Sequence, residues 1–131
     1  MAQRFTAYLF LGAAIVIASS PAQAQSHLRL AMGAYVSASV PCNQAANGSL
    51  MWWNGRALSA GGISNIVPRA GSRGSFNSTY VNYQDGNATE RVTIVVRGST
   101  RFTWVNRWGR LRYRFCADAA LPSQWRGMTP R

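Results

Sequence analysis

Apolar residues recur at every second position through most of this chain. Val, Thr, Tyr, Trp and Phe dominate these segments, and both the period of two and the residue types are typical of β-strands. Turn-forming pairs such as Asn54-Gly55 and Asp85-Gly86 separate them. The pattern predicts an all-β fold, a small antiparallel β-barrel or sandwich of about seven strands. The predicted strands are 30–37, 50–54, 62–68, 75–83, 89–97, 100–106 and 110–116.

The last hairpin can be placed in register, because residues that face each other across a sheet share one side of it. We place its turn at Arg107-Trp108, between Asn106 and Gly109. One face of the hairpin is then apolar and continues to Phe115, while the other face is basic. The predicted pairs are Trp104 with Leu111, Phe102 with Tyr113, Arg101 with Arg114, Thr103 with Arg112 and Val105 with Arg110.

The hairpin before it must bring Val92, Ile94 and Val96 onto the same apolar face. This requires an odd number of loop residues. A three-residue loop around Arg97-Gly98-Ser99, with Gly98 or a neighbour at positive φ, meets the requirement. Trp52 and Trp53 are adjacent in a strand and face opposite ways, so one belongs to the core and the other lines a second layer or is exposed.

The first residues have the pattern of a cleavable secretory signal peptide. Arg4 supplies a positive charge, residues 7–18 form an apolar run, and Ala22-Gln23-Ala24 has the small residues of a cleavage site. The apolar run is shorter than the roughly 20 residues that span a bilayer. We therefore predict a periplasmic or secreted protein. Its segments are a signal-peptide helix at 1–24, a mobile segment at 25–29, a β domain at 30–116 and an irregular tail at 117–131.

The chain has two cysteines, Cys42 and Cys116. An exported protein enters an oxidising compartment, so we expect a disulfide between them that ties the first part of the sheet to the last. For a closed loop of about 75 residues, the chain-entropy model predicts that the disulfide stabilises the folded state by on the order of 4 kcal/mol.

Charge is the second unusual feature. All 14 basic residues are Arg, and Asp85, Glu90 and Asp118 are the only acids. Without Arg4 the mature chain carries 13 − 3 = +10. Such a surplus favours an anionic envelope polymer, a membrane surface or an acidic protein as partner, and it also keeps a small domain soluble. Because we expect the protein to be exported, we do not expect nucleic acid to be its partner.

Catalytic groups are scarce. The single histidine, His27, lies two residues past the predicted cleavage site, and nothing in the pattern pairs two of the three carboxylates. With both cysteines in a disulfide, covalent and metal mechanisms lack their residues. We expect a protein that is not an enzyme and has no cofactor or metal.

The basic face of the last hairpin is the candidate binding site. Its arginines alternate along a strand at roughly 6.5 to 7 Å per two residues, which suits an extended polyanion. A solvated sheet face would show the same alternation. Exposed Trp next to Arg adds a surface for stacking. The candidate residues are Arg101, Arg107, Trp108, Arg110, Arg112 and Arg114.

Several motifs resemble those of small uncharacterised exported proteins of proteobacteria. They are Gly33-Ala34-Tyr35-Val36, Val40-Pro41-Cys42, the segment 50–58 and Arg112 to Cys116. That family often carries two further cysteines in the middle of the chain, which this chain lacks, and it implies no activity.

In size, predicted barrel and terminal disulfide, the chain is also similar to periplasmic inhibitors of C-type lysozyme. Their inhibitory Ser and Lys motif has no counterpart here, because the chain contains no Lys. Three functions follow as expectations. The first is a non-enzymatic β domain that binds an anionic envelope component or acidic protein through its arginines. The alternatives are a hydrolase inhibitor and a structural envelope protein.

Overall fold

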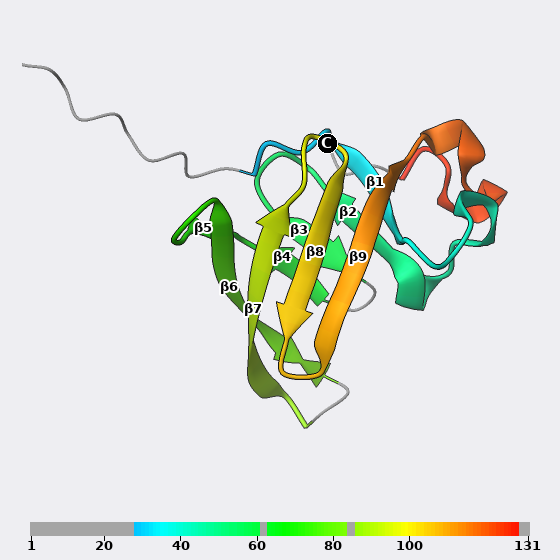
Figure 1. Cartoon of the computed structure of the whole chain (residues 1–131). Coiled ribbons are helices and arrows are strands. Elements are labelled where there is room, and N and C mark those ends of the chain that lie inside the picture. Colours follow the sequence, from blue (N-terminus) through cyan, green and yellow to red (C-terminus); the bar gives the residue numbers. More distant parts are fainter. Residues whose placement is uncertain (1–27, 61–62, 84–85, 129–131) are drawn as a thin grey trace, which may run out of the picture.

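The computed structural model describes residues 28–60, 63–83 and 86–128 (Figure 1). They form one antiparallel sheet of nine strands, together with 3-10 turns of three residues each. The strands are β1 (Gly33–Ser37), β2 (Leu50–Trp53), β3 (Leu58–Ala60), β4 (Ile63–Ile66), β5 (Arg69–Ala70), β6 (Ser75–Asn82), β7 (Ala88–Val96), β8 (Arg101–Asn106) and β9 (Gly109–Cys116).

The sheet curls into an open barrel. Its strand order is β4-β3-β2-β1-β9-β8-β7-β6-β5, so β4 and β5 form the two edges. Only Val67 and Pro68 connect these two strands, and three Cα–Cα steps of about 3.8 Å reach no more than about 11 Å. The edges must therefore lie close together. In Figure 1, β7 to β9 lie in front and β2 to β4 behind them.

The seam between the two edges is held by the connection itself. The Ser78 hydroxyl of β6 donates a hydrogen bond of 2.9 Å to the Val67 carbonyl. Within the described ranges, no backbone ladder pairs β4 with β5 or β6. Along this side the barrel is open, and the chain connection and the Ser78 hydrogen bond hold its two edges near each other.

The predicted all-β antiparallel class is confirmed, and the sheet has two strands more than the prediction. β3 and β5 have three residues and two residues, which is too short to show an alternating pattern. The turn before β3 is local: the Asn54 side-chain oxygen accepts hydrogen bonds from the backbone N–H groups of Arg56 and Ala57. The nine strands form one curled, barrel-like sheet and not the two packed sheets of a sandwich.

The predicted register of the last hairpin is confirmed at every pair, including Asn106 with Gly109. The preceding hairpin pairs Ile94 with Trp104 and Val96 with Phe102, as expected. Its loop is shifted by one residue and comprises residues 98–100, because the Arg97 N–H donates to the Arg101 carbonyl at 2.8 Å. Gly98 takes the positive φ, at 77°.

The principal core fills the inside of the barrel. Tyr35 is completely buried, and its ring packs against Phe102 with 5.3 Å between centroids. Leu28, which we expected to be mobile, is 4% exposed and belongs to this core. Its other buried members include Trp53, Leu58, Ile66, Val92, Ile94, Trp104 and Tyr113.

A second apolar cluster lies on the outer side of β1, β2 and the end of β9. Loop residues 38–49 and the tail after Cys116 cover this side, as the ribbon shows at the right of Figure 1. Leu121 is 1% exposed, and the Trp125 indole donates to the Ala45 carbonyl at 3.1 Å. Trp53 is in the principal core and Trp52 packs against this second cluster, so the two tryptophans face opposite ways as predicted.

The predicted signal peptide at 1–24, His27 and Asp85 lie outside the described residues. In the part of the chain that the structure describes, no helix is long and apolar enough to cross a membrane.

Tyr35 gives the barrel a defined response to alkaline pH. Its hydroxyl donates to the carbonyls of Ala31 and Ser99 at 2.7 and 3.3 Å, and burial raises its pKa to about 12. The unfolded chain loses this proton near pH 10, whereas the folded chain keeps it until about pH 12.

Stability from Tyr35 is therefore fully present below pH 10, and we expect a loss of about 2 to 3 kcal/mol as the pH rises from 10 to 12. Urea unfolding across this range measures the loss. Tyr35→Phe should reduce the pH-dependent part, with Tyr113, whose pKa burial also raises, as the remaining contributor. An equal loss in both proteins would contradict the assignment.

Candidate functional site

Five arginines line one groove on the outer face of β7, β8 and β9. The face is set by strand alternation, because their neighbours Tyr113, Phe102 and Trp104 point into the barrel. This arginine groove has a volume of about 660 Å³. Its lining residues are Ala38, Arg97, Arg101, Phe102, Thr103, Arg110, Arg112, Tyr113 and Arg114.

The sheet register brings the arginines together in rows. Arg101 pairs with Arg114 across β8 and β9, and the Arg97 backbone bonds to Arg101 on the other side. Adjacent strands are about 4.7 to 4.9 Å apart, so these guanidinium stems start within two strand spacings of one another. Like charges placed this way repel one another, and a bound anion would relieve this repulsion.

Four of these five side chains lack a protein partner. Among the described residues, none of these four guanidinium groups forms an ion pair or a hydrogen bond, and all four side chains are exposed. They therefore present unneutralised positive charge to solvent. The four are Arg97, Arg101, Arg110 and Arg112.

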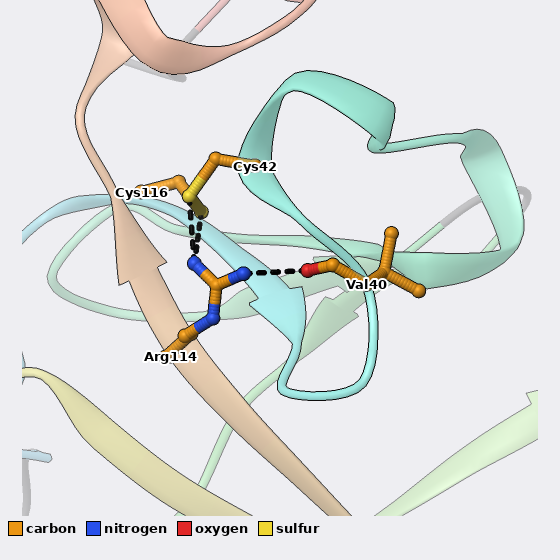
Figure 2. Close-up of a disulfide and its surroundings, with 4 residues drawn as sticks. All are labelled: Val40, Cys42, Arg114 and Cys116. Carbon is orange, nitrogen blue, oxygen red and sulfur yellow. Dashed lines mark hydrogen bonds between the residues drawn. A yellow bond between two sulfur atoms is a disulfide. The ribbon is translucent and has the colours of Figure 1, made fainter.

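Arg114 differs from the other four, and the expectation that it belongs to a free binding stripe needs correction. Its Nη1 lies 2.7 Å from Cys42 Sγ and 3.3 Å from Cys116 Sγ, and its Nη2 donates to the Val40 carbonyl at 2.6 Å (Figure 2). The predicted disulfide is present. The half-buried guanidinium therefore fastens loop 38–49 to β9.

Arg107 is also occupied. Its Nη2 lies 2.7 Å from Oε1 of Glu90, a buried carboxylate on the inner face of β7. No described residue gives that oxygen a hydrogen bond, so this ion pair compensates its charge. The Arg107 guanidinium also lies 4.4 Å from the centroid of the Trp108 ring, which is 67% exposed at the hairpin tip. These two residues form the end of the hairpin beside the arginine groove.

The acids lie away from the arginine groove. Glu90 points inward, and Asp118, in the tail, accepts a hydrogen bond from the Gly127 N–H at 2.8 Å. Of the three acids in the chain, these are the two that the structure describes. No described carboxylate therefore neutralises the groove.

Sequence reasoning omitted Arg97 from the site. The sequence contained a signal for it, since Arg97 continues the alternation of Arg91, Thr93 and Val95, which lie on the outer side of β7. The role of Arg114 had no such signal, because Val40 and Cys42 lie more than 70 residues earlier in the chain.

The described residues contain no group of three His, Cys, Asp or Glu that could hold a metal ion. The comparisons with protein-family models, with curated proteins and with solved structures found no match to this chain.

Arg114 and Arg112 make a matched pair for separating structure from binding. Arg114→Gln removes three contacts and leaves a carbonyl without its donor, so we expect a loss of about 1 to 3 kcal/mol in the free energy of unfolding. Arg112→Gln should change it by less than about 0.5 kcal/mol, because its side chain is exposed and unpartnered. Urea denaturation measures both, and equal effects would refute the structural role of Arg114.

Proposed function

We propose that this protein binds an anionic polymer of the cell envelope through the arginine groove and acts by binding rather than by catalysis. The observation that carries the proposal is the set of four exposed guanidinium groups without a described acidic partner: Arg97, Arg101, Arg110 and Arg112. Each guanidinium can hold a phosphate, sulfate or carboxylate through two parallel hydrogen bonds.

Electrostatics favours an extended anion over a single small one. Three of the four groups come from β8 and β9, and Arg97 directly follows β7. The groups repel one another, so the free energy falls as more of them are neutralised together. A polymer with repeated charges does this with one loss of translational freedom, whereas separate ions lose it several times. The groove therefore suits a polyanion.

A location outside the cytoplasm fits the covalent structure. The Cys42–Cys116 bond is consistent with an oxidising compartment, and the pattern of residues 1–24 is that of an export signal. A periplasmic or secreted protein with this charge meets the anionic polymers of the envelope.

The hairpin tip supports a second candidate, an inhibitor that presents a loop to the active site of an acidic hydrolase. Trp108 is 67% exposed and is held by Arg107, which is itself paired with Glu90. An exposed aromatic on a supported loop can anchor a protein interface. Such binding would depend on Trp108 and would tolerate salt better than polyanion binding.

The salt dependence of heparin binding tests the proposal. We expect retention on immobilised heparin to fall steeply between about 0.05 and 0.5 M NaCl, because the screening length shortens from above 10 Å to a few ångströms. At about 0.1 M NaCl, Arg110→Gln with Arg112→Gln should weaken heparin binding at least about tenfold, since two charge-assisted contacts are lost.

The control is Arg56→Gln with Arg73→Gln. It removes the same charge from exposed positions outside the groove lining and should weaken binding less than about threefold. Equal effects of the two pairs would show that net charge, not the groove, binds the polymer. Retention on heparin that is lost with Trp108→Ala but kept in both arginine pairs would place the binding site at the hairpin tip and contradict the arginine groove.

A further inference from the structure

A second groove, larger than the first, lies beside it on β5, β6 and β7. It has a volume of about 910 Å³ and combines two arginines with amide and hydroxyl side chains. Strand alternation places Asn77, Thr79 and Arg91 on the outer side, because Tyr80, Glu90 and Val92 point inward. The lining of this polar groove is Val67, Arg69, Asn77, Ser78, Thr79, Arg91 and Thr93.

The polar groove has more neutral hydrogen-bonding side chains than the arginine groove, in which Thr103 and Tyr113 carry the hydroxyl groups. The Thr93 hydroxyl donates to the Asn77 side-chain oxygen at 3.1 Å, which orients the Asn77 amide. Among the described residues, the Asn77 amide nitrogen and the Thr79 hydroxyl have no hydrogen-bond partner, and both side chains are exposed. Arg69 and Arg91 add two guanidinium groups that pair with no residue the structure describes.

A row of paired outward positions links the two grooves across the sheet. Asn77 pairs with Thr93, Thr93 with Val105 and Val105 with Arg110, so one row of outward positions runs from the polar groove into the arginine groove. Two strand spacings, about 10 Å, separate Thr93 from Arg110. One extended ligand can therefore contact both grooves.

We propose that the polymer bound by the arginine groove is an acidic polysaccharide, and that the polar groove binds its sugar hydroxyls. The inference rests on the proposed function and names its ligand class. A sugar ring that carries carboxylate, sulfate or phosphate groups needs neutral donors and acceptors beside cations. The shared face supplies both, with the amide of Asn77 and the hydroxyl of Thr79 next to Arg91.

The lining also disfavours single-stranded nucleic acid. Its bases bind by stacking on exposed aromatic rings. The aromatic residues at the arginine groove, Phe102 and Tyr113, are buried and stack on each other with centroids 5.0 Å apart. The polar groove is lined by no aromatic residue. Neither groove therefore provides a surface for bases.

The test compares two probes of similar charge, a size-defined heparin octasaccharide and inorganic polyphosphate, at about 0.1 M NaCl. Asn77→Ala with Thr79→Val should weaken octasaccharide binding about five- to thirtyfold, since one or two neutral hydrogen bonds are lost, and leave polyphosphate binding within about twofold. Asn43→Ala with Asn47→Ala is the matched control at exposed loop positions and should change neither. Isothermal titration gives the affinities, and unchanged thermal midpoints confirm folding.

The outcomes separate the two proposals. If Asn77→Ala with Thr79→Val changes neither probe, or weakens both equally, the polysaccharide inference fails. In those cases a loss of both probes with Arg110→Gln and Arg112→Gln still supports the arginine groove. If that arginine pair changes neither probe, the proposed function itself fails. Tighter binding of a single-stranded DNA of similar charge than of the octasaccharide would overturn the saccharide assignment in favour of nucleic acid.

Discussion

The Cys42–Cys116 disulfide and the Arg114 guanidinium bound to it hold together the two sides of this small domain. The bond joins the end of β9 to the loop after β1, across 74 residues of sequence. Arg114 adds a polar tie from the same strand to the Val40 carbonyl. Together they place loop 38–49 over the outer side of β1 and β2, where it buries the second apolar cluster with the tail. The outer side of β6 to β9 is left open to solvent.

The outer surface therefore has a covered side over β1 and β2 and an open side over β6 to β9, and the arginines are accessible on the open side. An antiparallel sheet needs one buried face, and the barrel interior supplies it for every strand except β5, whose two residues are exposed. The covered outer side is apolar and the open outer side is basic. Glu90 faces inward to meet Arg107 and does not neutralise its outward neighbour Arg91. The structure thus keeps the acids that it describes away from the arginines that line both grooves.

Much of the fold could be predicted from alternation and turn residues alone. The Asn106 to Gly109 turn fixes the register of the last hairpin, and the period of two then decides which residues face inward. The alternation correctly predicted that Arg101, Arg110 and Arg112 share the face of the sheet opposite the core. The anchoring of Arg114 could not be predicted, because it depends on where Val40 and Cys42 arrive in space.

Other features also lacked a local signal. β3 and β5 are too short to alternate, and they are stabilised by the longer strands beside them. The packing of Leu121 and Trp125 depends on a loop far away in sequence, as the hydrogen bond from the Trp125 indole to the Ala45 carbonyl shows. The polar groove joins residues of β5 to β7, and its Val67 is placed by the connection between β4 and β5. Such arrangements follow from tertiary contacts and not from the order of residues.

The pairing of β1 with β9 also has a consequence for the order of folding. Strands β6 to β9 are joined by consecutive hairpins, whose contacts are short in sequence, whereas β1 meets β9 across about 80 residues. Loop closure makes distant contacts slower to form, so we expect the meander first and the docking of β1 afterwards. The arginine-bearing surface would then exist on a partly folded chain before Cys42 reaches Cys116. Under the proposed function, this surface would be able to bind a polyanion before the disulfide closes.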